Sequence, residues 1–173
     1  MKRILFLIPF ILSDYSFSFS SPEQSFYCKF KQERFVKTVN LKLVSTGDVL
    51  VENGGKIIWS TRDPVENIIL VEANRIYRLQ NDKKLPLKNP IIKKMTEVMS
   101  SALKGDKTSL QKYFILENKN DGHTNLLVPK DEKLKKIIQL IEIKTKKYIE
   151  SFYMLEASGG YIKLAFDHCS KKI

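Results

Sequence analysis

Between Gly47 and Gln80, short apolar runs alternate with turn residues, a pattern typical of an antiparallel meander. The runs are 47–52, 56–61, 65–72 and 76–80. Asn53-Gly54-Gly55 provides a tight turn between the first two runs. Pro64, which cannot donate a backbone hydrogen bond to a sheet, separates the second run from the third. We predict four strands here, and the apolar face of such a meander needs a cover or a ligand.

A helical pattern follows the meander, after an expected loop over residues 81–87. Asn89 can cap a helix that has Pro90 in its first turn, and Gly105 can end it in the left-handed conformation. The apolar residues between them fall on one helix face and are Ile91, Ile92, Met95, Val98, Met99 and Leu103. We therefore predict an amphipathic helix between Pro90 and Gly105, and a further helical turn near residues 108–113.

The two ends of the chain complete the expected sheet. Ser21-Pro22-Glu23-Gln24 has the form of a capping box. Phe26 and Phe30 follow it at helical spacing, so we predict a short helix that ends near Arg34. Further strands are expected over residues 35–44, 123–129, 134–143, 148–156 and 161–166. This order predicts a mainly β (α+β) domain, in which two helices pack against one long curved sheet. The run 134–143 is apolar on both faces, which predicts cover on both of its sides.

The start of the chain has the pattern of a secretory signal peptide. Two cations precede an apolar run, residues 4–12, that is too short to span a bilayer, and small residues suit cleavage before Ser21. We therefore expect residues 1–20 to be a signal peptide and residues 21–173 to form a single domain. The bulky aromatic residues before Cys28 do not suit a lipid-anchor signal. These features predict a soluble secreted or periplasmic protein without a lipid anchor.

The chain is basic, with 30 Lys and Arg against 19 Asp and Glu and a formal net charge of +11. Nucleic-acid binding requires a basic stripe with stacking aromatic residues, whereas these lysines are scattered through predicted strands and loops. We interpret most of them as solvated residues on outer strand faces and expect no nucleic-acid partner. Attraction to an anionic membrane surface or to an acidic protein is the alternative.

The chain has two cysteines, Cys28 and Cys169. In an oxidising compartment an even count favours a disulfide, which would join the N-terminal segment to the C-terminal tail. Two free buried thiols are the alternative that the sequence leaves open.

Candidate catalytic chemistry is sparse in this sequence. His123 lies beside a predicted turn and His168 lies near the end of the chain. Asp121 could pair with His123, but a surface turn built on Asp121-Gly122 is the favoured interpretation. Asp167-His168-Cys169 does not suit a metal ion, because three adjacent residues rarely converge on one centre. We expect no enzymatic activity, no metal and no cofactor.

Several motifs occur in a definite order along the chain. They are Ser25 to Gln32, which ends in Phe-x-Gln, Gly47 to Val51, Trp59 followed by Pro64, Ala102 to Asp106 followed by Leu110 and Phe114, and Leu127 to Lys130. In this order they resemble the LolA family of periplasmic lipoprotein carriers and its LolA-like relatives. The resemblance implies an incomplete, strongly curved antiparallel β-barrel closed by helices. It further implies a hollow that holds the acyl chains of lipoproteins, or a related lipid, between an inner-membrane ABC exporter and an outer-membrane receptor.

The resemblance also gives candidate ligand-binding side chains. They are Phe30, Val49, Val51, Ile57, Trp59, Ile69, Ile91, Met95, Val98, Met99, Leu103, Ile141, Phe152 and Met154. Met95 and Met99 would supply adaptable packing around a lipid. From the residues alone, an apolar helix stripe of this kind is interpreted as core, and that alternative stays open.

In the best-studied members an arginine on the strand before the tryptophan helps to hold the lid closed. Counting back from Trp59 places Asn53 at that position in this chain. The favoured function is a monomeric periplasmic carrier of lipoprotein acyl chains or another lipid. The alternative is a non-enzymatic interaction or sensor protein of envelope assembly on the same fold, with the hollow filled by its own side chains.

Overall fold

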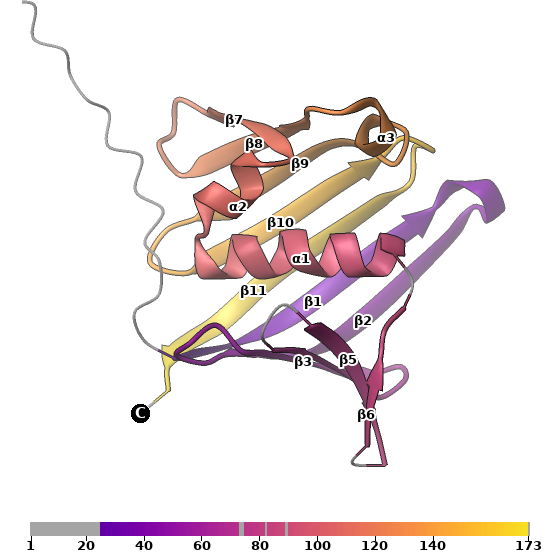
Figure 1. The fold of residues 1–173 in the computed structure, drawn as a ribbon, viewed down its shortest axis with the longest axis vertical. Coiled ribbons are helices and arrows are strands. Elements are labelled where there is room, and N and C mark those ends of the chain that lie inside the picture. The colour runs from indigo at the N-terminus through magenta and orange to yellow at the C-terminus, as the bar shows by residue number, and fades with distance from the viewer. Residues whose placement is uncertain (1–24, 73–74, 82, 89, 173) are drawn as a thin grey trace, which may run out of the picture.

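The computed structural model of the protein describes residues 25–72, 75–81, 83–88 and 90–172. In these ranges, eleven strands form one antiparallel sheet that does not close into a barrel, accompanied by three α-helices (Figure 1). The strands are β1 (Phe26–Val36), β2 (Leu41–Val51), β3 (Ile57–Asp63), β4 (Asn67–Glu72), β5 (Arg75–Gln80), β6 (Lys83–Pro86), β7 (Phe114–Asn118), β8 (Thr124–Pro129), β9 (Ile138–Thr145), β10 (Ile149–Glu156) and β11 (Tyr161–Lys171). The helices are α1 (Pro90–Lys104), α2 (Lys107–Gln111) and α3 (Glu132–Lys135), and a 3-10 helix, η1 (Lys37–Val39), joins β1 to β2. None of the helices within the described ranges is long and apolar enough to cross a bilayer.

The strand order places the first and last strands side by side at the centre of the sheet. The order is β6-β5-β4-β3-β2-β1-β11-β10-β9-β8-β7. Two antiparallel meanders, β2 to β6 and β7 to β10, therefore extend from the central pair to opposite edges. α1 and α2 connect the two edge strands, and α1 lies across one face of the sheet (Figure 1).

The predicted fold class, an incomplete antiparallel barrel with helices, is confirmed, as are the meander and the central helix. β2 to β5 occupy the runs predicted between Gly47 and Gln80, and the Glu52 N–H donates to the Lys56 carbonyl across the first turn, at 2.8 Å. α1 begins at Pro90 and ends before Gly105, as predicted, while its expected cap, Asn89, lies outside the described residues. Gly105 follows it with φ of +64°, a left-handed conformation that glycine adopts without steric cost.

The helix predicted to end near Arg34 is wrong in the part that the structure describes, because this segment forms β1. Phe26, Cys28 and Phe30 are buried at every second position, with polar or charged side chains between them. Apolar residues four apart satisfy both the helical and the strand period. The segment forms a strand and not a helix because it pairs with β2 on one side and with β11 on the other. The expected capping box and signal peptide lie outside the described residues.

Two other predicted segments differ at their boundaries. The strand expected over residues 35–44 is divided between β1 and β2, because Asn40 adopts a left-handed turn conformation, with φ of 48°, after η1. The loop expected over residues 81–87 contains β6, which pairs with β5. Pro86 ends this strand at the sheet edge, where a missing backbone donor is tolerated.

The strand predicted over residues 134–143 is in fact α3 followed by β9. An irregularity in the pairing of β9 with β10 places Leu140 opposite Leu155 but Ile138 opposite Glu156. This bulge brings Ile138 and Ile141 to the buried face together, although their spacing is odd. The mixed apolar pattern therefore reflects a bulge, not a strand that needs cover on both sides.

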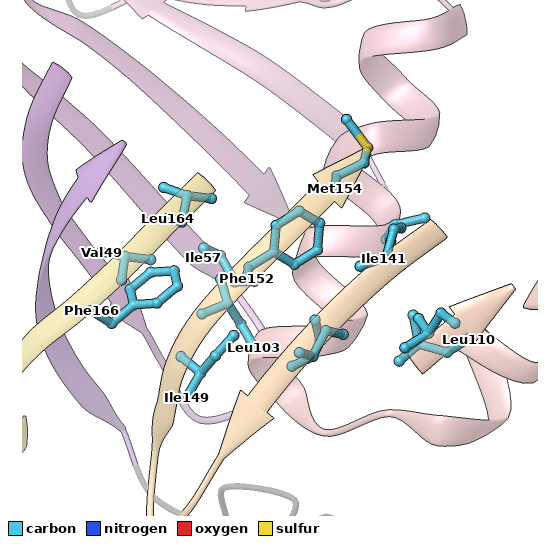
Figure 2. Packing of buried hydrophobic residues seen from close by; sticks show 14 of the residues in the cluster. Val49, Ile57, Leu103, Leu110, Ile141, Ile149, Phe152, Met154, Leu164 and Phe166 are labelled. Atoms are coloured by element: carbon cyan, nitrogen blue, oxygen red, sulfur yellow. The ribbon is translucent and has the colours of Figure 1, made fainter. Parts of the chain in front are cut away.

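One hydrophobic cluster lies between the sheet and the helices. Ile57 of β3, Phe152 of β10 and Leu103 of α1 belong to it, so the cluster joins both meanders to the central helix (Figure 2). Leu110 of α2 is fully buried in the same cluster. Fully burying a side chain of this size contributes about 1.5–3 kcal/mol, so the cluster is the main source of stability.

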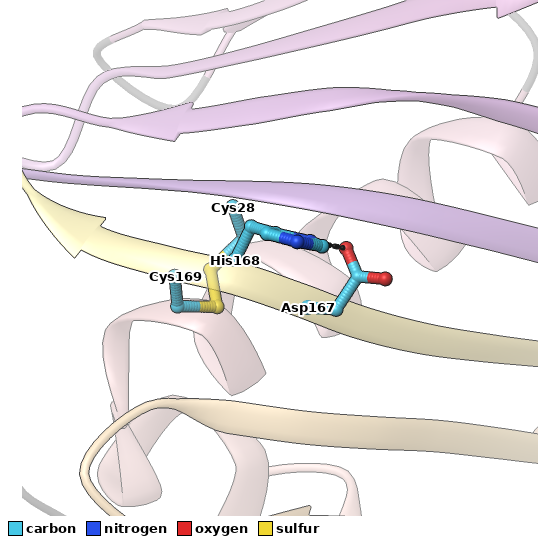
Figure 3. Close-up of a disulfide and its surroundings, with 4 residues drawn as sticks. All are labelled: Cys28, Asp167, His168 and Cys169. Atoms are coloured by element: carbon cyan, nitrogen blue, oxygen red, sulfur yellow. Dashed lines mark ion pairs between the residues drawn. A yellow bond between two sulfur atoms is a disulfide. The ribbon is translucent and has the colours of Figure 1, made fainter.

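A disulfide joins the two central strands. Figure 3 shows Cys28 of β1 bonded to Cys169 of β11. Cys28 is fully buried, whereas the neighbouring Asp167 and His168 are exposed and form an ion pair of 3.0 Å if the imidazole is protonated. The cysteines are therefore a covalent link between the ends of the chain, and Asp167 and His168 lie outside the core.

Candidate functional site

A cavity of about 200 Å³ lies between α1 and the face of the sheet that it covers. Its walls come from β1, β3, β4, β10 and β11, and α1 forms its roof. The lining residues are Gln32, Ile57, Trp59, Ile69, Val71, Met95, Thr96, Met99, Ser100, Leu103, Phe152, Met154, Ile162 and Leu164. Both halves of the sheet and the helix that connects their edges therefore contribute to one site.

Strand pairing explains how the sheet residues of the cavity come together. Four directly opposed pairs line it: Ile57 with Val71, Trp59 with Ile69, Phe152 with Leu164 and Met154 with Ile162. Directly opposed side chains lie on the same sheet face. The pairing of β3 with β4 and the pairing of β10 with β11 thus produce two apolar walls that face α1.

The spacing of residues in α1 explains the roof. Met95, Met99 and Leu103 recur every fourth residue and so lie on one side of the helix. Methionine side chains are unbranched and flexible, so Met95, Met99 and Met154 can repack around ligands of different shape. The roof and one wall therefore combine a fixed backbone with adaptable side chains.

The cavity has a small polar region. Gln32 of β1 and Thr96 and Ser100 of α1 are its polar lining residues. Their amide and hydroxyl groups match the hydrogen-bonding needs of an ester or amide carbonyl. The lining residues include no Asp, Glu, His, Cys, Lys or Arg. This arrangement can hold an apolar ligand with one polar end.

The structure brings together eight of the fourteen candidate ligand-binding residues in the cavity lining. They are Ile57, Trp59, Ile69, Met95, Met99, Leu103, Phe152 and Met154. Four others, Phe30, Val49, Val51 and Ile141, are buried in the adjoining core. Val98 is buried on the side of α1 that faces α2, and the side chain of Ile91 lies outside what the structure describes.

Six lining residues were absent from the candidates. They are Gln32, Val71, Thr96, Ser100, Ile162 and Leu164. Alternation with Ile69 would have pointed to Val71, and alternation along β11 groups Ile162 with Leu164. The three polar residues carry no signal of this kind, because polar residues on a strand or helix are expected to face solvent.

Two lysines of α1 hold the roof against neighbouring segments. The Lys94 ammonium lies 3.5 Å from the centre of the Tyr113 ring and 3.1 Å from a Glu97 carboxylate oxygen. Burial lowers the pKa of Lys94, but the contacts with Tyr113 and Glu97 outweigh it and raise the pKa above its usual value. The cation is thus retained between α1 and the segment that leads into β7.

Lys104, at the other end of α1, lies over the β2–β3 turn. A Cβ atom on Gly55 would be 3.0 Å from its Nζ atom, so the absence of a side chain at Gly55 makes room for this cation. Burial lowers the pKa of Lys104, and the nearby Asp106 carboxylate only partly offsets that effect. This turn, not a strand arginine, is therefore where the end of α1 meets β2 and β3.

Asn53 does not occupy a position on a strand facing α1. It lies exposed in the β2–β3 turn, and its N–H donates to Ser25 Oγ at 3.0 Å. Counting back from Trp59 fails here because the turn Asn53-Gly54-Gly55 lies between β2 and β3. The contact with the end of α1 is made instead near Gly55.

The other polar candidates have structural roles. Asp121 accepts hydrogen bonds from the His123 N–H at 2.9 Å and from the Thr124 N–H at 2.8 Å, and Thr124 Oγ1 donates to it at 2.6 Å. The Thr124 hydroxyl bond, followed by the two backbone bonds, lowers the pKa of Asp121 to about 2. Asp121 therefore closes a turn. Across the part of the chain that the structure describes, no three His, Cys, Asp or Glu side chains are placed to hold a metal ion.

Comparison with known proteins identifies the family. Residues 22–173 match the model of the family described as outer membrane lipoprotein carrier protein LolA. A search of curated protein sequences found no match.

Three solved structures are similar to this chain at low identity. A LolA superfamily protein of Nitrosomonas europaea has 10% identity over 88% of each chain and a TM-score of 0.48. The Pseudomonas aeruginosa MucA/MucB complex gives 14% identity over 87% of this chain and 53% of that chain, with a TM-score of 0.47. Lipoprotein LppX of Mycobacterium tuberculosis has 12% identity over 88% of this chain and 89% of that chain, with a TM-score of 0.42. The family assignment rests on the match over residues 22–173, and by that match this chain belongs to the LolA family.

Proposed function

We propose that this protein carries the acyl chains of a lipoprotein, or of a related lipid, in the cavity beneath α1. The observation that carries the proposal is the cavity itself, which is lined by apolar side chains and has Gln32, Thr96 and Ser100 as its polar region. An acyl chain would occupy the apolar part, and the ester or amide that links it to its headgroup would meet the polar side chains. The family's description as a lipoprotein carrier supports this ligand class.

The energetics of such a ligand suit a carrier. Each methylene group removed from water contributes about 0.8 kcal/mol, without any directed contact, so affinity grows with the length of chain enclosed. The cavity of about 200 Å³ is smaller than the roughly 300–1,000 Å³ typical of ligand sites. Loading a long acyl chain therefore requires α1 to move outward, with the methionines repacking around the ligand.

In this proposal α1 is a lid. Lys94 and Lys104 hold its two ends against Tyr113 and the β2–β3 turn, while Met95 and Met99 face the ligand. The contacts at the ends are polar and partly exposed, so each contributes little to keeping the lid closed. A lid held in this way releases its ligand without breaking a buried ionic network.

The proposed pathway places the carrier in the periplasm. Residues 1–20 would direct export and be removed, and the mature domain would work as a monomer without a cofactor. It would receive lipid from an inner-membrane ABC exporter and deliver it to an outer-membrane receptor. The disulfide between Cys28 and Cys169 supports an oxidising compartment. The proposed role is transport and chaperoning of lipid cargo, with no catalysis.

Lipid extraction from the exported protein, followed by mass spectrometry, tests this function. We expect co-purified acyl lipid in the unaltered protein and a loss of at least tenfold in Met99→Glu, because the new carboxylate would face an apolar lining. Met99→Leu preserves the apolar surface and should keep the lipid. Thr108→Glu adds the same charge on the exposed side of α2 and should keep it too.

A fluorescence titration gives a second, independent readout. Trp59 is the single tryptophan of the chain and lines the cavity. A brominated fatty acid should therefore quench its emission in the unaltered protein and much less in Met99→Glu. No lipid in the extract and no quenching would reject the carrier function. That result would favour the alternative, an interaction or sensor protein whose hollow is filled by its own side chains.

A further inference from the structure

The hairpin formed by β1 and β2 extends well beyond the neighbouring strand β3. β1 and β2 stay paired as far as Val36 and Leu41, whereas the pairing of β3 with β2 ends opposite Thr46. β11 begins opposite Phe35. The tip of the hairpin therefore projects beyond β3, as the upper right of Figure 1 shows. On its other side Lys37 lies over Gly159 of the β10–β11 turn, where a Cβ atom would be 2.9 Å from the Lys37 Nζ atom.

Large apolar side chains are exposed on this projecting tip. Val39 is 67% exposed, Leu41 47% and Leu43 48%. Val36, half-buried, lies opposite Leu41. We call Val36, Val39, Leu41 and Leu43 the apolar lip. Adjacent exposed apolar side chains of this kind mark a site of interaction, unlike apolar residues that are exposed singly.

The apolar lip lies on the same face of the sheet as the residues that line the cavity. Gln32 lines the cavity, and alternate residues of a strand share a face, so Arg34 and Val36 lie on the same face as Gln32. Arg34 lies between Leu43 of β2 and Ile162 of β11, and Ile162 is itself a lining residue. A continuous surface therefore leads from the cavity to the lip.

Basic side chains outnumber acidic ones at this end of the sheet, with Arg34 on the face of the lip and Lys31, Lys42 and Lys163 on the opposite face. Residues 31–45 and 156–163 carry five Lys or Arg and two Asp or Glu. The two acidic residues are partnered, since Glu33 pairs with Lys42 at 3.2 Å and Glu156 with Arg34 at 3.7 Å. Lys37 lies at the tip itself, within η1. Apolar side chains next to an excess of cations are the combination that binds the surface of an anionic bilayer.

We propose that the apolar lip inserts into the headgroup region of an anionic phospholipid bilayer and so places the cavity mouth at the membrane surface. Binding of the lip to the bilayer stands independently of the ligand. Passage of acyl chains from the bilayer along Leu43 and Ile162 into the cavity rests on the proposed carrier function.

Co-sedimentation with vesicles tests the lip. We expect the unaltered exported protein to bind vesicles of phosphatidylglycerol mixed with phosphatidylcholine, more weakly at high salt, and hardly to bind phosphatidylcholine alone. Leu41→Ser combined with Leu43→Ser should weaken binding roughly tenfold or more, since two inserted side chains are lost. Both leucines are about half exposed, so the variant should remain folded, which circular dichroism would check.

A matched control changes the same number of exposed apolar residues elsewhere. Val44 lies on the opposite face of β2, and Ile115 lies on the distant edge strand β7. Val44→Ser combined with Ile115→Ser should bind vesicles as the unaltered protein does. Equal binding by the lip variant and the control, or no binding by the unaltered protein, would overturn the proposal. Self-association that the lip variant abolishes, without vesicle binding, would assign the lip to a second copy of the chain instead.

Different experimental results would reject the membrane-binding role of the lip and the carrier function. Met99→Glu should lose lipid but bind vesicles normally, because Met99 lies beneath α1 and not on the lip. The lip variant should keep lipid in the cavity but exchange it with vesicles more slowly. Vesicle binding without any lipid loading would leave the lip standing and reject the carrier function.

Discussion

The ring centres of Phe30 and Trp59 lie 4.6 Å apart, and Gly47 makes this contact possible. Phe30 is on β1 and Trp59 on β3, while Gly47 is on the strand between them, directly opposite Phe30. A Cβ atom on Gly47 would be 2.9 Å from the Phe30 ring and would also collide with the Ser60 carbonyl oxygen. The aromatic pair forms the wall behind the cavity, with Trp59 on its inner surface.

Gly47→Ala should therefore destabilise the protein by about 1–3 kcal/mol, the usual cost of adding a methyl group to a packed site. The Ser60 obstacle is a backbone atom, so a rotamer change cannot relieve it. Urea unfolding followed by the emission of Trp59 measures the change. Ser45→Ala, two residues away on the same strand, is the matched control and should change stability little. A fully stable Gly47→Ala protein would contradict this view of the packing.

The disulfide should be a major source of stability. Cys28 and Cys169 are 141 residues apart in the sequence, so the bond constrains most of the unfolded chain. Replacing both cysteines by serine should lower the free energy of unfolding by about 2–5 kcal/mol. Urea unfolding with and without a reductant measures this. Reductant should destabilise the unaltered protein and leave the double variant unchanged, and equal effects on both would argue against the bond.

The turn at Asp121 should titrate at unusually low pH. Its pKa is lowered to about 2 by the Thr124 hydroxyl and by the His123 and Thr124 backbone N–H groups. The folded state binds a proton here more weakly than the unfolded state. The stabilisation is therefore complete above the ordinary pKa of 3.8 and is lost as the pH falls through about 2.

An NMR titration of the Asp121 carboxyl carbon measures this pKa. Thr124→Val should raise the pKa part of the way back, because it removes the first of these contacts and leaves the backbone bonds in place. Thr108→Val removes an exposed hydroxyl elsewhere and should have no effect on it. An ordinary pKa for Asp121 in the unaltered protein would contradict the turn geometry.

Local patterns were enough to predict the meander and α1. The turn Asn53-Gly54-Gly55, the cap before Pro90 and the stop at Gly105 each depend on residues next to one another in the sequence. β1 could not be predicted in this way. Phe26 and Phe30 fit either period, and the strand is decided by β2 and by β11, which is more than 100 residues further along the chain.

The cavity shows the same division between local and distant information. Spacing in α1 places Met95, Met99 and Leu103 on one face, and all three line the cavity. Phe30 is different, because its contact with Trp59 depends on Gly47, which lies on another strand. The residues next to Phe30 in the sequence do not reveal this contact. The polar lining of Gln32 and its neighbours depends on register across three segments, so it emerges only in the folded chain.

The connection between the sheet edges limits how far α1 can travel. The Leu87 N–H still bonds the Ile76 carbonyl at 2.9 Å, so only residues 88 and 89 span the gap to Pro90. Three Cα–Cα steps join Leu87 to Pro90, and they reach about 10 Å at full extension. At its other end Gly105 leads directly into α2, whose Leu110 is anchored in the core. α1 is therefore attached at both ends, and these two short connections limit the distance that it can move. In the proposed carrier, an acyl chain would therefore enter beside α1 while both ends of the helix stay attached.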